Sequence, residues 1–452
     1  MSSIHSNDNQ NSLSKRGNDI ISFKDTLFEA YMLWQKNPYH PKSNPQGIIN
    51  MNTSENKTVS DILLPKLNEG IEITEEMLYY GNLIGRDYFL QAMANFLTKY
   101  FKASRPVLKE ELIGLCGAGP IINIVGSVVC DPEEYLLIPS PYYGAFAPDL
   151  SFMSQVRLFP VDLTSEIKEP YLEPFQLTVP ALEKALQQAV SQGKRVKGFL
   201  FSNPVNPSAS YFTKQMIKDY LDFAHRHELH IIFDEIYYLS SHAPDADVIS
   251  VLSMINELPD PKRTHFIWAF SKDFASSGLR AGILWTQNSE LAAAAGGCSR
   301  FSGISPPTQK QLTNMITDYD WLDNVYFPTM RRRLKESYGI VRQTLDELDI
   351  RYVIPKAGLF VWIDLIKFMP SVDLEGERKL WLSLAENGVG TAPGYAFYCS
   401  ERGWYRIIFS LPVADVTLDQ KQRKSQAFQS KKGKPRNKKP SLRIFSLYAE
   451  SA

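Results

Sequence analysis

Apolar and polar positions along the chain form blocks that predict buried strands separated by helices. Short apolar runs rich in β-branched and aromatic residues occupy residues 113–116, 135–138, 196–201, 230–233 and 266–270. Runs of this length and composition are typical of buried strands. Apolar residues at helical spacing precede the first run, at 88–101, and lie between later runs, at 121–129 and 212–225. This alternation predicts an α/β fold with a mostly parallel central sheet and helices on both faces.

A lysine follows the predicted strand at 266–270. The apolar run breaks at residues 271–273, which include Lys272, and resumes after Arg280. Ligands of α/β sheets bind at the carboxyl edge, and partial burial there lowers the pKa of a lysine amine and makes it a nucleophile. The loop is short enough to bring the Arg280 guanidinium beside a group held by the lysine, in a geometry suited to phosphate. Taken alone, the pattern is also that of a solvated strand end.

Four other predicted strands end in small or polar residues. They are Gly117 to Pro120, Tyr142 with Tyr143, Asn206, and Asp234 with Tyr237. Small residues before a helix let backbone amides approach an anion, although a plain turn between strand and helix has the same spacing. Since parallel strands end at one edge of the sheet, we expect these groups to meet Lys272 around one ligand. Pyridoxal phosphate carries an aldehyde, which the lysine amine can bind, and a phosphate, which the arginine guanidinium can bind, so it fits this set of residues.

The pattern changes after Phe301 and predicts a second, smaller α+β domain. A long helix is expected at 321–348, with short strands at 351–354, 360–363 and 406–409. Arg406 at the start of the last strand is the candidate clamp for a carboxylate. Near the N-terminus a helix is expected at 19–35. The predicted divisions are a disordered tail (1–18), an N-terminal arm with part of the small domain (19–75), a large cofactor-binding domain (76–305), a C-terminal small domain (306–412) and a basic, disordered tail (413–452).

Composition and charge narrow the function classes. The apolar fraction of 44% and the charged fraction of 22% are those of a globular protein. No apolar run is long enough to span a bilayer and the N-terminus does not resemble a signal peptide, so the cytoplasm is expected and no membrane partner. Residues 421–440 hold nine Lys or Arg and no acid, so the rest of the chain has 40 basic and 49 acidic residues. This acidic body argues against nucleic acid as a partner, while the basic segment is either a disordered tail or an import or membrane-surface patch.

Cysteine and histidine positions predict no metal site. The four cysteines lie far apart, as expected of reduced thiols. His225, His227 and His230 are close in sequence, but their spacing does not place them on one face of a helix.

Taken together, these residues resemble the fold type I pyridoxal-phosphate enzymes of the class I and II aminotransferase family. Within that family the chain is similar to 1-aminocyclopropane-1-carboxylate synthases and to the vertebrate synthase-like proteins, of which the second paralogue is the expected relative. The resemblance covers about residues 20–412. Its specific stretches are Thr53-Ser-Glu-Asn56, Ile138-Pro-Ser-Pro-Tyr-Tyr-Gly144, Pro174-Phe-Gln-Leu-Thr178, Asn203-Pro-Val-Asn-Pro207, Asp234-Glu-Ile-Tyr237, Pro259-Asp-Pro-Lys-Arg-Thr-His265, Ser271-Lys-Asp-Phe274 and Gly403-Trp-Tyr-Arg406.

The resemblance implies three catalytic residues. Lys272 would carry pyridoxal 5'-phosphate as an internal aldimine and move protons in the reaction. Asp234 would pair with the pyridine nitrogen and keep the ring an electron sink. Tyr237 would bind the phenolic oxygen of the ring.

The resemblance also implies the residues that bind the cofactor and substrate. Asn206 would share the phenolic oxygen with Tyr237, and Tyr143 would stack on the ring. The residues expected to hold the phosphate are Ser271, Arg280, the loop at Ala118 and Gly119, and Tyr80 from the neighbouring subunit of a homodimer. Arg406 would bind the α-carboxylate of a small amino-acid substrate, and Glu55 stands where the synthases place an active-site glutamate; alone it would be a surface turn acid.

Several positions depart from the family pattern. The phosphate loop, Gly117-Ala-Gly-Pro120, lacks the usual hydroxyl residue, and Pro120 removes an amide donor. The motif at 203–207 continues to Ser208-Ala209 instead of a glycine, and Asn52 replaces a small residue. Residues 305–307 are stiffer than usual, and the sequence leaves the family pattern after Pro412.

Three functions remain open from the sequence. The first is an aminotransferase-type enzyme of amino acid metabolism, in which Lys272 takes the α-proton of a small amino acid. The second is a synthase-type lyase that uses S-adenosylmethionine and shares those steps. The third is a catalytically inactive dimer that keeps the fold as a binding protein, which the altered phosphate loop favours and the retained Lys272, Asp234 and Arg406 oppose.

Overall fold

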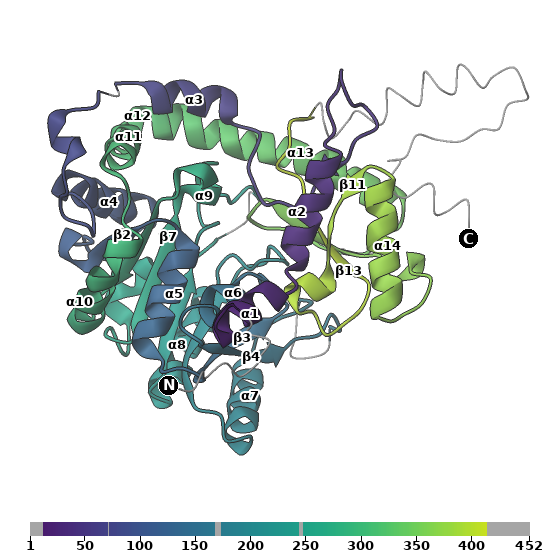
Figure 1. Ribbon diagram of the computed structural model, residues 1–452, viewed down its shortest axis with the longest axis horizontal. Helices are drawn as coiled ribbons and strands as arrows, with labels where there is room; N and C mark the ends of the chain where they lie inside the picture. Colours follow the sequence, from purple (N-terminus) through teal and green to yellow (C-terminus); the bar gives the residue numbers. More distant parts are fainter. Residues whose placement is uncertain (1–11, 71, 168–172, 244–246, 414–452) are drawn as a thin grey trace, which may run out of the picture.

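The computed structural model describes residues 12–70, 72–167, 173–243 and 247–413. The largest sheet in these residues has seven strands (Figure 1). They are β2 (Leu112–Leu115), β3 (Tyr135–Ser140), β4 (Arg157–Asp162), β5 (Val196–Ser202), β6 (His230–Asp234), β7 (Thr264–Ala269) and β8 (Gly282–Thr286), in the order β2-β8-β7-β6-β5-β3-β4. β8 runs antiparallel to β2 and β7, and the pairs from β7 through β4 are parallel. The predicted α/β class with a mostly parallel sheet is confirmed.

Both faces of this sheet are covered by helices. The helices on and around it are α4 (Asp87–Tyr100), α5 (Ala118–Val129), α6 (Phe146–Ser151), α7 (Val179–Ser191), α8 (Lys214–Arg226), α10 (Ser289–Cys298) and α11 (Pro306–Thr317). Successive strand residues point to opposite faces. Phe199, Phe233 and Phe266 pack in one core with α4, α7 and α8, whereas Leu200 and Ile232 pack in another with α5 and α10. The uninterrupted apolar runs of the central strands therefore reflect burial on both sides.

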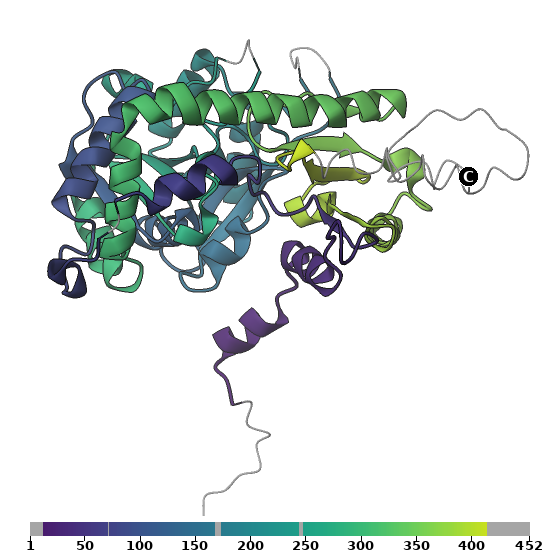
Figure 2. The ribbon, with the colours of Figure 1, turned by 90° about the horizontal axis from the view of Figure 1, so that it is seen from above.

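A four-stranded antiparallel sheet, in the order β12-β13-β10-β9, forms the second part. Its strands are β9 (Tyr352–Val353), β10 (Phe360–Asp364), β12 (Ala392–Pro393) and β13 (Trp404–Ile408). β1 (Ile49–Asn50) pairs separately with β11 (Val389–Gly390). The other helices are α1 (Lys15–Ser22), α2 (Thr26–Lys36), α3 (Ser60–Asn68), α9 (Phe270–Asp273), α12 (Tyr319–Trp321), α13 (Phe327–Glu347) and α14 (Leu374–Glu386). Figure 2 shows α13 running along one side of the molecule, past both the large and the small sheet.

The structure differs from the sequence prediction at three elements. The helix expected at 19–35 is two helices, α1 and α2, because Asp25 caps a new start by accepting the Phe28 N–H (3.0 Å). α1 also begins at Lys15, inside the predicted tail. The long helix expected at 321–348 begins as α12, continues through a π-helical turn at 322–326 and becomes α13, whose first turn contains a proline that cannot donate a backbone hydrogen bond. Arg406 lies in the middle of β13, which begins two residues earlier, after Gly403 at φ 91°.

The predicted terminal tails and the predicted domain boundaries are the two expectations that the described residues do not fully test. The predicted tails lie mostly outside the described residues, which begin at 12 and end at 413, and the domain boundaries remain predictions. In the part of the chain that the structure describes, no helix is both long enough and apolar enough to cross a bilayer.

Ala209 adopts a left-handed backbone conformation, and it lies in the stretch where the resemblance implied a glycine. Its φ is +59°, and the residue is fully buried. Its N–H donates to the Val205 carbonyl (2.8 Å), and its carbonyl accepts from the Lys356 N–H (3.0 Å). The surrounding hydrogen bonds therefore hold an alanine in a conformation that is unfavourable for a residue with a Cβ atom.

A buried carboxylate holds the turn that contains Lys272. Asp273 accepts hydrogen bonds from the Leu239 N–H (3.0 Å), the Ser240 hydroxyl (2.6 Å) and the Trp268 indole N–H (2.9 Å). Burial raises the pKa of Asp273 to about 7, and the hydrogen bonds from Ser240 and Trp268 oppose that rise. Asp273 thus ties α9 to the segment that follows Tyr237, so these two turns keep a fixed spacing.

Replacing Ala209 by glycine should stabilise the protein. The left-handed conformation costs an alanine about 1–2 kcal/mol, while glycine costs about 0.5–1 kcal/mol through the entropy of the unfolded chain. We expect the free energy of unfolding to rise by about 0.5–1 kcal/mol, measured by urea denaturation. Ala293→Gly, an exposed position within α10, is the control and should lower it by about 1 kcal/mol.

Replacing Asp273 by asparagine should flatten the pH dependence of stability. The amide keeps an oxygen for two of the donors, and its NH2 group donates to the Ser240 hydroxyl. Because the pKa of Asp273 is raised, the folded protein holds a proton that the unfolded chain releases above about pH 4. The free energy of unfolding of the wild-type protein therefore falls between about pH 4 and pH 7, by at most about 1.4 kcal/mol per pH unit from this group.

Urea denaturation between about pH 4 and pH 7 measures how steeply the free energy of unfolding changes with pH in the wild type and in Asp273→Asn. Equal slopes in the wild type and Asp273→Asn would show that Asp273 is ionised throughout. Asp273→Leu, which leaves the donors without an acceptor, should lower the free energy of unfolding at every pH, by about 1–3 kcal/mol for each orphaned donor.

Candidate active site

Lys272 lies in α9, directly after β7, with its side chain partly buried. Its Nζ donates to the Ser54 carbonyl oxygen at 2.6 Å. Burial and the Arg406 charge lower the pKa of the amine to about 8, and the charges of Glu55 and Asp234 oppose that shift. A lysine with this pKa has a substantial free-amine fraction near neutral pH, which is the form that attacks a carbonyl carbon.

Asp234 ends β6, the strand next to β7, and is 2% exposed. Its Oδ2 accepts a hydrogen bond from the Ser202 hydroxyl at 2.9 Å. Oδ1 is buried and has no hydrogen-bond donor among the described residues. Burial raises the pKa of Asp234 to about 7, and the bond from Ser202 opposes the shift. A buried carboxylate oxygen without a partner is suited to receive a proton or an N–H group from a ligand.

Tyr237 follows Asp234 by one turn and is 2% exposed. Its hydroxyl lies 3.0 Å from the Ser54 Oγ. The edge of its ring packs against Phe360 in β10, with ring centroids 5.2 Å apart. Burial raises the pKa of the phenol, so it stays protonated as a hydrogen-bond donor.

Arg406 brings a guanidinium from β13 to the same place. Its Nη1 donates to the Asn206 Oδ1 (2.9 Å) and its Nη2 to the Asn52 carbonyl (2.5 Å). The guanidinium lies 4.7 Å from the ring centroid of Phe397 and 5.2 Å from that of Phe360. Burial lowers its pKa, and its Nε has no acceptor among the described residues. The guanidinium is thus held on both Nη atoms, while its Nε–H has no acceptor among the described residues.

An anion cup is formed where β2 leads into α5. Gly117, at φ 112°, precedes the helix, and Ala118 and Gly119 are its first two residues. A Cβ atom on Gly117 would lie 3.0 Å from the Arg280 Nη2, so a larger residue would push the guanidinium away, and the φ of 112° also favours glycine. Arg280 reaches this position from a left-handed turn (φ 49°) and donates to the Ser277 carbonyl at 3.0 Å. A helix N-terminus beside a guanidinium attracts anions.

A carboxylate that the sequence did not reveal also lies at this cup. A Cβ atom on Gly119 would lie 3.1 Å from the Asp149 Oδ2. Burial raises the pKa of Asp149 to about 6, against the nearby Arg280 charge. An acid here complements the helix N-terminus but opposes a second anion. Asp149 lies in α6, and no pattern around it in the sequence marked it for this role.

Of the other predicted residues, Glu55, Tyr143 and Ser271 lie at or next to the site, whereas Tyr80 does not. Glu55 accepts a hydrogen bond from the Ser277 hydroxyl (3.1 Å) and acts on the Lys272 pKa, so it lies beside the site. Tyr143 follows β3, and the charges of Asp149 and Arg406 both act on its phenol, whose pKa burial raises to about 12. Ser271 directly precedes Lys272 and is partly buried. Tyr80 is fully exposed and is not brought to the site within one chain, so its contribution to a neighbouring subunit stays a prediction.

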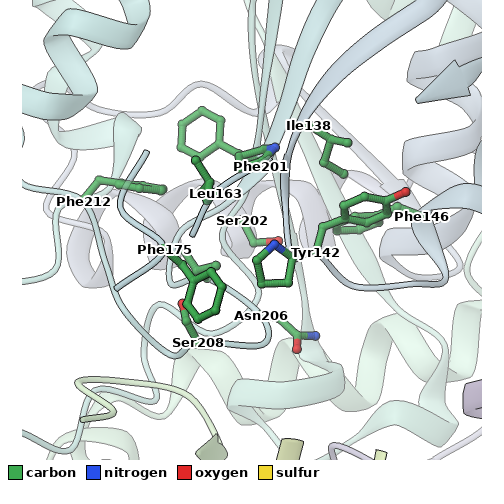
Figure 3. A pocket seen from close by; sticks show the side chains of 13 residues that line it. Ile138, Tyr142, Phe146, Leu163, Phe175, Phe201, Ser202, Asn206, Ser208 and Phe212 are labelled. Atoms are coloured by element: carbon green, nitrogen blue, oxygen red, sulfur yellow. The ribbon is translucent and has the colours of Figure 1, made fainter. Parts of the chain in front are cut away.

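A pocket adjoins Asn206 and Ser202, as Figure 3 shows. Its walls are mostly apolar and come from β3, β5, the start of α6 and the loops that follow β3, β4 and β5. The labelled side chains are Ile138, Tyr142, Phe146, Leu163, Phe175, Phe201, Ser202, Asn206, Ser208 and Phe212. The packing of these aromatic residues supports the strand ends that carry the polar groups.

Sequence reasoning missed three contributors besides Asp149. Ser202 holds Asp234, the Asn52 carbonyl holds Arg406, and Ser54 contacts both Lys272 and Tyr237. Asn52 and Ser54 lie in or next to the stretch 53–56 that marked the resemblance, but two of their contacts use backbone carbonyls, which no residue pattern reveals. Ser202 could have been noticed as the last residue of its strand, level with Asp234 in the next one.

The sequence is similar to a known protein family and to named proteins of vertebrates. The family model for aminotransferase class I and II matches residues 46–418. The bovine (Bos taurus) 1-aminocyclopropane-1-carboxylate synthase-like protein 1 is 40% identical over 400 residues, covering 88% of this chain and 80% of the relative. The human (Homo sapiens) protein named "probable inactive 1-aminocyclopropane-1-carboxylate synthase-like protein 2" is 38% identical over 400 residues, covering 88% and 70%.

Solved structures agree on the fold. An aspartate aminotransferase from Thermus thermophilus with maleate superposes with a TM-score of 0.71 at 17% identity, covering 90% of this chain and 97% of that one. The similar identities to the two synthase-like paralogues do not single out the second as the expected relative. Together these matches show that the chain belongs to the class I and II aminotransferase family.

Proposed function

We propose that the protein is a pyridoxal-phosphate-dependent aminotransferase-type enzyme acting on a small amino acid. The observation that carries the proposal is the position of Lys272 directly after β7, next to Asp234 at the end of β6, with its amine bonded to the Ser54 carbonyl. Burial and the Arg406 charge lower the pKa of this amine to about 8. The family is one of pyridoxal-phosphate enzymes, and this chain brings the Lys272 amine and the Asp234 acid at the edge of the large sheet together with the Arg406 guanidinium from the small sheet. Cytoplasmic location and a place in amino acid metabolism belong to the same proposal.

The residues present fit the cofactor. The buried Oδ1 of Asp234 has no donor among the described residues, and a ring nitrogen that carries a proton would supply one. The close approach of Arg280 to Gly117 leaves a guanidinium beside the uncapped start of α5, as a phosphate requires. Tyr237 and Asn206 offer polar groups for the ring oxygen, and Ser271 a further hydroxyl for the phosphate. The Asp149 carboxylate is the feature at the cup that disfavours an anion.

Each residue then has a defined task. When bound, pyridoxal phosphate stabilises negative charge on the carbon next to the substrate's amino group. Lys272 Nζ takes the proton from that carbon and returns it, which its lowered pKa permits near neutral pH. Arg406 binds the substrate carboxylate through N–H groups that now contact Asn52 and Asn206 or are unpaired. The buried Asp234 keeps the ring nitrogen protonated.

A homodimer completes the proposed site. Tyr80 is fully exposed, and Tyr79 and Leu78 next to it are 61% and 71% exposed. An exposed apolar group of this kind is typical of a surface that another chain covers. In the dimer Tyr80 would reach the anion cup of the neighbouring subunit.

Two alternatives from the sequence share this fold. A synthase-type lyase would use the same residues on S-adenosylmethionine and differ in how the substrate side chain is held. Two features favour an inactive binding protein: the Asp149 carboxylate at the anion cup, and a loop at 117–120 that contains no hydroxyl residue.

Lys272→Ala should abolish the visible absorption band that pyridoxal phosphate gains on binding a lysine amine. The alanine has no nitrogen to react with the aldehyde carbon. Lys99→Ala removes a surface lysine that pairs with Asp323 and should keep the band, which controls for reaction at exposed amines. A band unchanged in Lys272→Ala, or absent from the wild-type protein, would contradict the cofactor assignment. A wild-type band that responds to no amino acid and not to S-adenosylmethionine would favour the inactive alternative.

Arg406→Lys should leave the cofactor band in place but weaken its response to amino acids. Lysine keeps the charge but cannot form two parallel hydrogen bonds to a carboxylate. Loss of one charge-assisted hydrogen bond, about 1.5–3 kcal/mol, raises the amino-acid concentration for a half-maximal spectral change about 10- to 100-fold. Arg402→Lys is the control. Arg402 pairs with Glu377 of α14, so this variant should respond as the wild type does. Equal responses in both variants would remove Arg406 from the substrate site.

A further inference from the structure

Ser54 contacts two of the candidate catalytic residues at once. Its carbonyl oxygen accepts a hydrogen bond from the Lys272 Nζ (2.6 Å), and its Oγ lies 3.0 Å from the Tyr237 hydroxyl. Ser54 and Tyr237 are both buried, at 5% and 2% exposed. Water therefore does not compete strongly for the contact between the two hydroxyl groups.

The segment that carries Ser54 is held in place by hydrogen bonds on both sides. The Asn50 Oδ1 accepts from the Asn52 and Thr53 N–H groups, each at 3.1 Å. The Ser410 hydroxyl donates to the Glu55 carbonyl at 2.7 Å. The position of Ser54 is thus set by β1 and by the residues that follow β13, rather than by Tyr237 or Lys272.

Either hydroxyl can donate in this contact, and counting protons shows what each direction leaves free. Each hydroxyl has one proton to donate, and the contact between them uses one of the two. If Ser54 donates, the Tyr237 proton remains available to a ligand. A bond donated to the phenol oxygen polarises its O–H and makes it a stronger donor.

We propose that Ser54 is a positioning residue whose hydroxyl donates to Tyr237 and so strengthens the hydrogen bond from Tyr237 to the ring oxygen of the cofactor. The inference rests on the proposed function, because it assigns Tyr237 to that oxygen. Through its carbonyl the same residue holds the Lys272 amine. Ser54 thus couples the segment at 50–56 to both groups that would act on the cofactor.

A double-mutant cycle on the protein loaded with pyridoxal phosphate tests this inference. Ser54→Ala removes the hydroxyl but keeps the carbonyl that binds Lys272. A hydrogen bond donated to the ring oxygen lowers the pH at which the bound chromophore loses its proton, because it stabilises the negative charge on that oxygen. Ser54→Ala should therefore raise the midpoint pH of the visible band, by about 0.3 pH unit. In a Tyr237→Phe background the same change should have no effect on the midpoint.

A control and a cofactor-free measurement separate this role from a structural one. Ser410→Ala removes a hydroxyl that holds the same segment but touches neither catalytic candidate, so it should lower the melting temperature without moving the midpoint. In the cofactor-free protein, Ser54→Ala and Tyr237→Phe should lower the melting temperature non-additively, since either one breaks the same bond.

The outcomes distinguish this inference from the proposed function. An unchanged midpoint in Ser54→Ala, or an equal shift with and without the Tyr237 hydroxyl, overturns the inference and leaves the proposed function standing. The absence of any band in the wild-type protein overturns both. A shift that requires the Tyr237 hydroxyl, with none in Ser410→Ala, supports it.

Discussion

The burial of three ionisable groups beside one another is the constraint on which the candidate site depends. Asp234 and Arg406 are buried and Lys272 is partly buried where the two sheets meet, and the charge of each would be costly to bury alone. Burial moves all three pKa values toward the neutral forms, while their charges act on one another through a medium that screens poorly. The Lys272 amine is consequently poised near neutrality, between a carboxyl of similar pKa and a guanidinium with an unpaired N–H.

The fold supplies this arrangement because its layers are rigid. Parallel strands with aromatic residues on one face and aliphatic residues on the other bring Asp234 and Lys272 to neighbouring strand ends. Asp273 then fixes the Lys272 turn to the segment after Tyr237. The antiparallel sheet adds Arg406 from the opposite side, and the segment at 50–56 closes the space between them with two backbone carbonyls.

The anion cup is the part of the site with opposing features. Gly117 and Arg280 are fitted to one another, and α5 begins without a side-chain cap, which suits a phosphate. Pro120 costs the helix little, since it is the third residue, where a backbone N–H has no partner within the helix, but it leaves one amide donor fewer for an anion. Asp149, by contrast, brings a carboxylate to the same helix end. The balance between Arg280 and Asp149 sets how strongly an anion is held.

The sequence alone determined the class of fold and pointed to most of the candidate site, because apolar runs, small-residue turns and strand-end polar residues are local signals. Lys272, Asp234, Tyr237, Asn206 and Arg280 were predicted from such signals, and the resemblance implied Tyr80 and a task for each residue. Tertiary structure alone decided which groups contact one another. The break between α1 and α2, the central place of Arg406 in β13, the carboxylate of Asp149 and the two contacts of Ser54 depend on caps, strand pairing and backbone carbonyls. Apart from the local cap at Asp25, these contacts join residues far apart in the chain, and a residue pattern carries no record of them.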